Sequence, residues 1–284
     1  MITSVSNGRI KQLILLREKS RIRNREGLFL AEGLKMFEEA PPEKIREVYV
    51  SERLWQEFEQ EGNSGGRRFF IWKKLCDCME RGILVEQVSE EVFKKASDTQ
   101  TPQGILFVME QFSCSLKDML KKAEDKKNES GKAPLFLILE DIQDPGNLGT
   151  MIRTGEGAGV DGVIMSRGTV DIYNPKTIRS TMGSLYRVPF LYTEELGAVI
   201  AELKKHHISV YAAHLKGEKY FDEISYEGGS AFLIGNEGNG LRRETAELSD
   251  SFLKIPMEGK LESLNAAVAA ALLMYQAAGY ARKR

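Results

Sequence analysis

The stretch LEDIQDPGNLGTMIRTGEGAG, residues 139–159, gives the first indication of the fold. The apolar run Leu135–Leu139 predicts a buried strand, a D-P-G tripeptide predicts a tight turn, and Asn147 is expected to open a helix. In open α/β sheets, ligands bind at the carboxyl ends of the strands. Asn147 and Arg153 could therefore serve one cleft, although a helix cap and a surface cation also explain this pair.

The rest of the second half repeats this alternation of strands and helices. Apolar runs predict five further strands, and helical stretches lie between most of them, so a largely parallel sheet covered on both faces is expected. These strands are Gly162–Ser166, Val188–Tyr192, Ser209–Ala213, Ala231–Ile234 and Phe252–Ile255. The fold class is therefore α/β.

The first 112 residues predict a smaller α/β domain. Its strands are expected at 28–31, 46–50, 68–71, 83–87 and 104–109, and its helices at 35–39, 53–61, 75–81 and 90–97. The segment SCSLKDMLKKAEDKKNESGK, residues 113–132, has little apolar surface and is interpreted as a solvated helix or linker. The predicted domains are therefore 1–112 and 133–284.

Composition limits the class of protein. The chain has 284 residues, is 42% hydrophobic and 29% charged, and contains no apolar run long enough to span a membrane, so a soluble protein without a membrane partner is expected. No signal peptide is recognisable, and three cysteines are too few for a disulfide framework, which favours a cytoplasmic location. Cys76 and Cys78 form a C-x-C pair without further ligands nearby, so no metal site is expected.

Charge is concentrated at the N-terminus. The formal net charge is −1, so any nucleic-acid binding must come from a local patch. The first 25 residues hold one acid, Glu18, and a group of seven cations, which could bind a phosphate backbone or form a solvated helical face. The seven are Arg9, Lys11, Arg17, Lys19, Arg21, Arg23 and Arg25.

Two later segments also carry candidate site residues. In FLIGNEGNGL, residues 232–241, a strand breaks into a loop in which glycines allow close approach to a ligand and Glu237 is the only acid; a solvated turn would look similar. In KIPMEGKLESLNAAVAAALLMYQAAGY, residues 254–280, Ser263 is expected to cap a long alanine-rich helix. The positions expected to be buried along it are Leu264, Ala267, Val268, Ala271, Leu272 and Tyr275.

Together these segments resemble the SpoU family of the SPOUT superfamily. The matching motifs are N-L-G-T-M-I-R-T at 147–154, S-T-M-G-S-L-Y-R-V-P-F at 180–190, I-G-N-E-G-N-G-L at 234–241 and I-P-M-x-G-x-x-x-S-L-N at 255–265. The shorter motifs F-L-A-E-G at 29–33 and T-P-Q-G-I at 101–105 are similar to those of the family's substrate-binding domain, which has an L30e-like fold.

The resemblance implies a trefoil-knotted C-terminal domain that binds S-adenosylmethionine and methylates a ribose 2′-hydroxyl of RNA. It implies a homodimer, and an RNA partner rather than DNA, with ribosomal RNA preferred over transfer RNA. The implied catalytic residues are Asn147, Arg153, Glu237, Ser263 and Asn265. The implied cofactor-binding residues are Gly235, Ile255, Met257 and Leu264.

The role of Arg153 is left open by the sequence. The family view makes it the base, but a guanidinium keeps its proton in proteins, so we favour stabilisation of negative charge on the 2′-oxygen. Two rival functions also remain: a non-enzymatic RNA-binding protein with a degenerate second domain, and an enzyme of the same fold that modifies a base.

Overall fold

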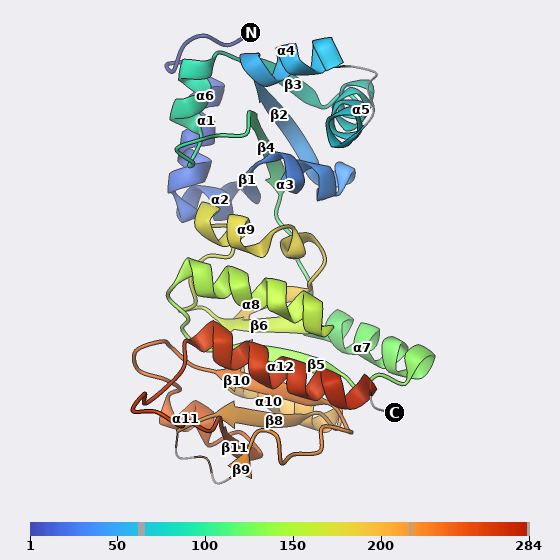
Figure 1. Cartoon of the computed structure of the whole chain (residues 1–284), viewed down its shortest axis with the longest axis vertical. Coiled ribbons are helices and arrows are strands. Elements are labelled where there is room, and N and C mark those ends of the chain that lie inside the picture. The colour runs from blue at the N-terminus through green and yellow to red at the C-terminus, as the bar shows by residue number, and fades with distance from the viewer. Residues whose placement is uncertain (62–65, 216, 218, 283–284) are drawn as a thin grey trace. The chain divides into compact units, whose positions relative to one another are not determined.

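The computed structural model describes residues 1–61, 66–215, 217 and 219–282 (Figure 1). The chain divides into two compact units. The first comprises Met1–Phe112 and Tyr173–Tyr186, and the second comprises Ser113–Ile172 and Arg187–Arg284. The short return segment in the first unit was not expected from the sequence.

The first unit is built on a four-stranded sheet in the order β1-β4-β2-β3. β2 and β3 are parallel, whereas β4 runs antiparallel to both β1 and β2. The strands are β1 (Leu28–Glu32), β2 (Ile45–Ser51), β3 (Leu84–Val88) and β4 (Ile105–Glu110). The helices are α1 (Gly8–Glu18), α2 (Ser20–Glu26), α3 (Leu34–Glu39), α4 (Glu52–Glu61), α5 (Arg67–Glu80), α6 (Glu90–Ala96) and α9 (Pro175–Thr181).

One strand expected in this unit is wrong. Residues 68–71 lie in α5, although phenylalanine and isoleucine there have a high propensity for strands. Ile71, Leu75 and Cys78 are buried at helical spacing, so packing of one helix face decides the structure. On the same helix, Trp72 meets Trp55 of α4 edge to face, with ring centroids 5.6 Å apart.

The second unit contains a seven-stranded sheet in the order β7-β6-β5-β10-β8-β11-β9. Every pair of neighbours in it is parallel, as the alternation of strands and helices predicted. The strands are β5 (Leu135–Leu139), β6 (Gly162–Ser166), β7 (Phe190–Thr193), β8 (Ser209–Ala213), β9 (Lys219–Tyr220), β10 (Ser230–Ile234) and β11 (Ser251–Lys254).

Helices cover both faces of this sheet (Figure 1). α7 (Leu116–Ser130) and α10 (Leu196–Lys205) share a hydrophobic core with alternate residues of the strands, such as Phe136 and Ile138 of β5. On the other face lie α8 (Pro145–Ala158) and α12 (Ala266–Arg282), packed against each other. A short helix, α11 (Arg243–Ala246), follows β10.

The segment 113–132, interpreted as a solvated helix or linker, contains the helix α7. Ser115 caps α7 through a capping box with Asp118, and Met119 is fully buried in the core of the second unit. The few apolar residues of this segment fall on one face of the helix, and that face packs against the core of the second unit.

No described helix is long and apolar enough to cross a membrane.

The glycines of α8 serve helix packing. A Cβ at Gly157 would lie 2.6 Å from the Tyr275 hydroxyl of α12, so a larger residue here would require the Tyr275 side chain to move. The face expected to be buried on α12 is only partly right. Ala267 is buried, but Val268 and Tyr275 are 48% and 50% exposed. Other buried residues of this helix are Ala270, Leu273, Met274 and Ala277.

Candidate active site

Three segments that follow strands of the parallel sheet meet the same edge of that sheet. Residues 140–144 follow β5, residues 235–241 follow β10, and residues 255–265 follow β11 and lead into α12. Because all these strands are parallel, their carboxyl ends open at one edge, where α/β proteins place their ligands.

The first of these segments positions Asn147. The helix begins at Pro145 and is capped by Asp144, whose Oδ1 accepts the Asn147 N–H at 2.8 Å, so the expectation that Asn147 opens the helix is wrong. Since Asp144 does the capping, the Asn147 amide is available for other partners. Its Nδ2 donates to Glu237 Oε1 at 3.0 Å, and its Oδ1 accepts from Asn265 Nδ2 at 2.9 Å.

Glu237 joins the loop after β10 to the start of α8. Besides the Asn147 amide, its carboxylate accepts the backbone N–H groups of Gln143, at 3.0 Å, and Asp144, at 3.1 Å. Burial raises the pKa of Glu237, but these hydrogen bonds outweigh it and hold the pKa below the ordinary glutamate value. Glu237 is therefore an anion that orients amides at neutral pH.

Asn265, not Ser263, caps the last helix. α12 begins at Ala266, and Asn265 Oδ1 accepts the Ala267 N–H at 2.9 Å. Ser263 is exposed two residues before the cap and makes no hydrogen bond to the part of the chain that the structure describes. Asn265 thus uses its oxygen on the helix and its nitrogen on Asn147, so one residue links α12 to α8.

Asn147, Glu237 and Asn265 are therefore brought together, while the two other expected catalytic residues stand apart from this cluster. Arg153 is exposed on α8, and its side chain forms no hydrogen bond or ion pair with any described residue. A cation that is not used by the protein is suited to bind an anionic ligand. The Ser263 hydroxyl is likewise exposed and forms no hydrogen bond with any described residue.

The residues expected to hold a cofactor share one property. All four are half-buried, and their backbone N–H groups donate to no residue within the described ranges. They are Gly235, Ile255, Met257 and Leu264. A Cβ at Gly235 would lie 2.2 Å from the Gly240 carbonyl carbon, so this position requires glycine. Half-buried backbone groups without protein partners fit the adenosyl and methionine groups of S-adenosylmethionine.

Sequence analysis did not predict several residues at this edge. Asp144 was recognisable, because an acid directly before proline is typical of a helix N-cap followed by the first helical residue. Asn236 donates through Nδ2 to the Asp141 carbonyl at 2.8 Å. Glu140 is buried and bonds to Arg242. Neither contact has a signal in the sequence, because the partners are about 100 residues away.

Comparison with known proteins identifies the family. Residues 134–275 match the SpoU rRNA Methylase family, and residues 7–106 match the MRM3-like substrate binding domain. The chain is 33% identical over 280 residues to the 23S rRNA (guanosine(2553)-2′-O)-methyltransferase RlmP of Bacillus subtilis, covering 98% of this chain and 99% of that one. This chain belongs to the SpoU rRNA methylase family.

Further relatives of this SpoU methylase agree with that assignment. It is 30% identical over 241 residues to the 23S rRNA (guanosine-2′-O-)-methyltransferase RlmB of Bordetella pertussis, covering 83% of this chain and 89% of that one. A solved rRNA methyltransferase from Sinorhizobium meliloti superposes with a TM-score of 0.78 at 29% identity, covering 97% of this chain and 96% of that one. Its AdoMet-bound form has the same score at 28% identity and the same coverage.

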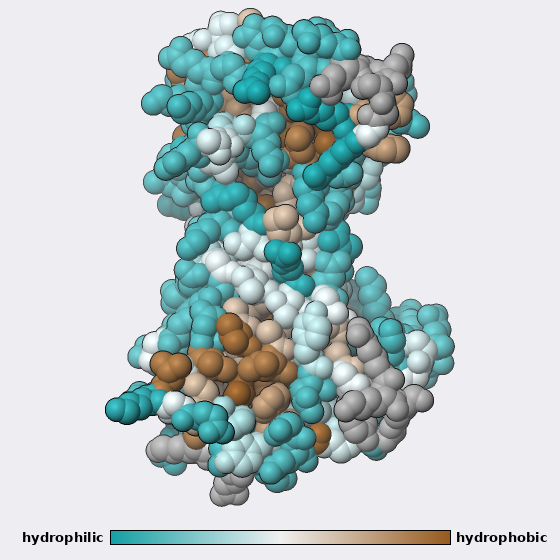
Figure 2. Space-filling view, viewed as in Figure 1, coloured by the Kyte–Doolittle hydropathy of each residue, from teal (hydrophilic) through white to brown (hydrophobic). Residues whose placement is uncertain are grey.

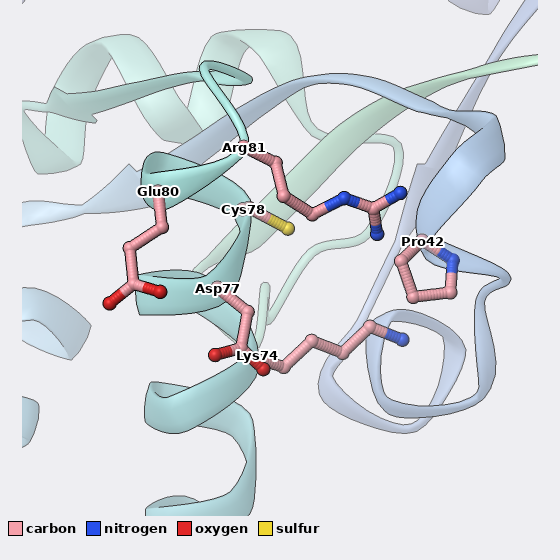
Figure 3. Close-up of a pocket in the computed structure, with 6 residues that line it drawn as sticks. All are labelled: Pro42, Lys74, Asp77, Cys78, Glu80 and Arg81. Atoms are coloured by element: carbon pink, nitrogen blue, oxygen red, sulfur yellow. The ribbon is translucent and has the colours of Figure 1, made fainter.

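The first unit of this SpoU methylase has a cavity of its own, of about 370 Å³. Figure 3 shows Lys74 and Arg81 pointing toward Pro42, while the carboxylates of Asp77 and Glu80 point the other way. Lys74 Nζ donates to the carbonyl oxygens of Glu38 and Ala40 and lies over the Phe37 ring. Burial raises the pKa of the Cys78 thiol, which keeps it protonated and unreactive. We assign no catalytic role to this cavity.

The seven cations at the N-terminus divide into three groups. Arg23 is only 3% exposed and donates to the carbonyl oxygens of Leu16 and Arg17, and the Arg17 guanidinium in turn donates to the Ser97 carbonyl at 2.7 Å. For these two, the expectation of a phosphate contact is wrong. Arg9 and Arg25 form surface ion pairs. The side chains without a described partner are those of Lys11, Lys19 and Arg21.

Proposed function

We propose that this chain is an S-adenosylmethionine-dependent RNA methyltransferase that methylates a ribose 2′-hydroxyl, in ribosomal RNA rather than transfer RNA. The observation that carries the proposal is the hydrogen-bonded cluster of Asn147, Glu237 and Asn265, together with the four half-buried cofactor candidates whose backbone N–H groups have no described partner. RlmP and RlmB are by name 23S rRNA guanosine 2′-O-methyltransferases, which supports both the reaction and the class of RNA.

S-adenosylmethionine supplies an electrophilic methyl group to this reaction. The backbone groups of Gly235, Ile255 and Leu264 would hold it, with Met257 beside them. The bonds between Asn147, Glu237 and Asn265 fix the first turns of α8 and α12, so that the site is organised before the ligands arrive. Methyl transfer depends mostly on such positioning.

Arg153 provides the positive charge of the site. It is exposed, and without a described partner, on the helix whose first turn holds Asn147. We assign it to the target phosphate and to negative charge that develops on the 2′-oxygen. Its guanidinium remains protonated and is therefore better suited to stabilise an anion than to remove a proton. Ser263 and Asn265 would orient the ribose.

We also propose that two copies associate through α12. Val268, Leu272 and Tyr275 lie on one face of this helix and are 48%, 39% and 50% exposed. Figure 2 shows apolar side chains gathered over α12. A patch of this kind favours burial against another protein surface, and the same helix of a second copy would supply one. Light scattering at micromolar concentration would report the mass of a dimer, and a monomer would contradict this proposal.

The first unit is assigned to RNA binding, with an L30e-like fold, and the trefoil knot of the second unit stays a prediction. A cytoplasmic location follows from the proposed substrate.

Two measurements test the proposal. Calorimetry is expected to show S-adenosylmethionine binding that needs no added metal and survives a chelator. Mapping of 2′-O-methyl groups in RNA from cells with and without the protein identifies the substrate, and an unchanged map would contradict the proposed activity.

A further inference from the structure

Glu140 is a buried carboxylate directly after β5, and the reaction as described does not use it. It is 1% exposed, and its partners all come from one distant segment. The backbone N–H of Arg242 donates to Oε2 at 2.8 Å, while Arg242 Nε and Thr245 Oγ1 donate to Oε1 at 2.8 and 2.5 Å. Burying a carboxylate is costly unless hydrogen bonds compensate for the lost water, and here three do.

The bonded segment comes directly after the loop 235–241. That loop closes on itself, because Asn236 and Gly240 exchange backbone hydrogen bonds of 3.1 and 2.9 Å. At its start, Asn236 Nδ2 donates to the carbonyl of Asp141, the residue after Glu140. At its end, Arg242 is held by Glu140 itself. Both ends of the loop are thus attached to residues 140–141.

The loop carries Glu237, which bonds to Asn147 and to two backbone N–H groups before α8. It also begins with Gly235, one of the proposed cofactor-binding residues. We propose that Glu140 is a positioning residue that fixes this loop, and thereby sets both the cofactor-binding backbone and the Glu237 carboxylate. The inference rests on the proposed function only in naming S-adenosylmethionine as the ligand.

The substitution Glu140→Gln tests this directly. It preserves volume but replaces one acceptor oxygen by an NH₂ group, which then faces N–H or O–H donors. The Arg242 side chain is 54% exposed, so water can replace its bond while the loop loosens. Leaving buried groups mismatched in this way is expected to weaken S-adenosylmethionine binding about tenfold.

The chain offers a matched control at the other end of the same strand. Asp161 has a side chain only 8% exposed; its Oδ2 accepts the Leu135 N–H at 2.9 Å, and its Oδ1 pairs with Lys126. Asp161→Asn therefore also disturbs a carboxylate that is bound to a backbone N–H and a cation, but at the amino end of β5. It is expected to lower the thermal midpoint without changing the Kd for S-adenosylmethionine.

The experiment measures that Kd by calorimetry for the full chain and for E140Q, D161N, E237Q and the double variant E140Q/E237Q. We expect D161N to bind like the wild type, and the losses from E140Q and E237Q to be less than additive, because both act through one loop. Unchanged binding by E140Q, a loss in D161N equal to that in E140Q, or full additivity would each overturn the inference.

Hydrogen exchange gives a second readout that does not need the cofactor. The amides of Asn236, Gly238, Asn239 and Gly240 are hydrogen-bonded within the loop. E140Q should accelerate their exchange and D161N should not; equal rates in E140Q and wild type would overturn the inference.

If E140Q does not fold, Thr245→Val removes a single donor and is judged by the same outcomes. If the wild type binds no S-adenosylmethionine, the proposed function fails, and exchange alone decides on Glu140.

Discussion

The carboxyl edge of the seven-stranded sheet and the helices α1 and α2 are both rich in polar residues that the sequence marked as functional, but they use them differently. At the sheet edge, Asn147, Glu237 and Asn265 bond to one another from three distant segments, and Arg153 has no described partner. In α1 and α2, by contrast, Arg17 and Arg23 donate to backbone carbonyls. The first region leaves an exposed cation without a described partner, whereas the second uses two of its cations to bind its own backbone.

The difference teaches that a cluster of charges in the sequence does not reveal which side chains remain available. A buried guanidinium that donates to carbonyl groups acts as a structural element, because removing it leaves polar groups unsatisfied. Removing an exposed guanidinium that has no partner leaves the free energy of unfolding unchanged. Four tests, ordered by expected effect, examine this distinction.

Arg153→Ala should have the largest effect, on the reaction alone. Losing a donor aimed at developing negative charge costs about 10²–10³ in rate. Binding of S-adenosylmethionine, measured by calorimetry, should be nearly unchanged, and Arg153→Lys should restore part of the rate because it keeps the charge but not the planar fork. Near wild-type turnover by the alanine variant, or a defect mainly in cofactor binding, would remove Arg153 from its assigned role.

Asn147→Asp should lower activity about tenfold at neutral pH, because it places a second carboxylate against Glu237. In the wild type, the pKa of Glu237 lies below the ordinary value of 4.5. The hydrogen bonds that its carboxylate accepts are therefore fully present above pH 4.5, and they are lost only as the pH falls through the lowered pKa. In the variant, the new like charge raises that pKa. Its activity relative to wild type should therefore recover as pH falls, whereas the relative activity of Asn147→Ala should stay flat; matching profiles would contradict the cluster.

Arg23→Met should affect stability rather than chemistry. It removes the donor from the buried Leu16 and Arg17 carbonyl groups, at a cost of about 1–3 kcal/mol. A fall of several degrees in the thermal midpoint of the first unit is expected. Arg21→Ala, two residues earlier on the same helix, is the control and should leave the midpoint unchanged. Equal midpoints for both variants would show that the buried contacts of Arg23 do not matter.

Neutralising Lys11, Lys19 and Arg21 together should have the smallest effect, confined to RNA binding. These side chains have no described partner, so the free energy of unfolding should stay within about 0.5 kcal/mol of wild type per substitution. If they bind phosphates, the slope of log affinity against log salt falls by roughly 0.7–0.9 for each phosphate that is no longer neutralised. A slope equal to that of the wild type would identify them as part of a solvated helical face.

Much of the second unit could be predicted from the sequence. The bounds of β5, β6 and β8 agree with the expectation, because short apolar runs between turn residues have few alternatives in a parallel sheet. Residues 68–71 were assigned to a strand because four residues make only about one helical turn, too few to reveal the spacing that α5 completes over 14 residues. The segment 113–132 was difficult to assign because Met119, Leu120 and Ala123 are spaced among lysines.

The hydrogen bonds that link the candidate site residues could not be predicted from the sequence. Asn147, Glu237 and Asn265 were all candidates, yet their mutual hydrogen bonds span 90 and 118 residues of sequence. The capping roles were exchanged, from Asn147 to Asp144 and from Ser263 to Asn265, because several polar residues near a helix start compete for one cap. Glu140 could not be distinguished from a surface acid before its burial was known.

The pair Trp55 and Trp72 has a practical consequence for anyone who handles this protein. They are the only tryptophans in the chain, and both lie in the first unit, with their rings nearly perpendicular at 88°. Indole emission is therefore an optical label of the first unit alone, built in without any dye. Tyrosines occur in both units, for example Tyr49 in the first and Tyr211 in the second, so a tyrosine signal would not separate them. Unfolding of the first unit can thus be followed by tryptophan emission in the intact chain.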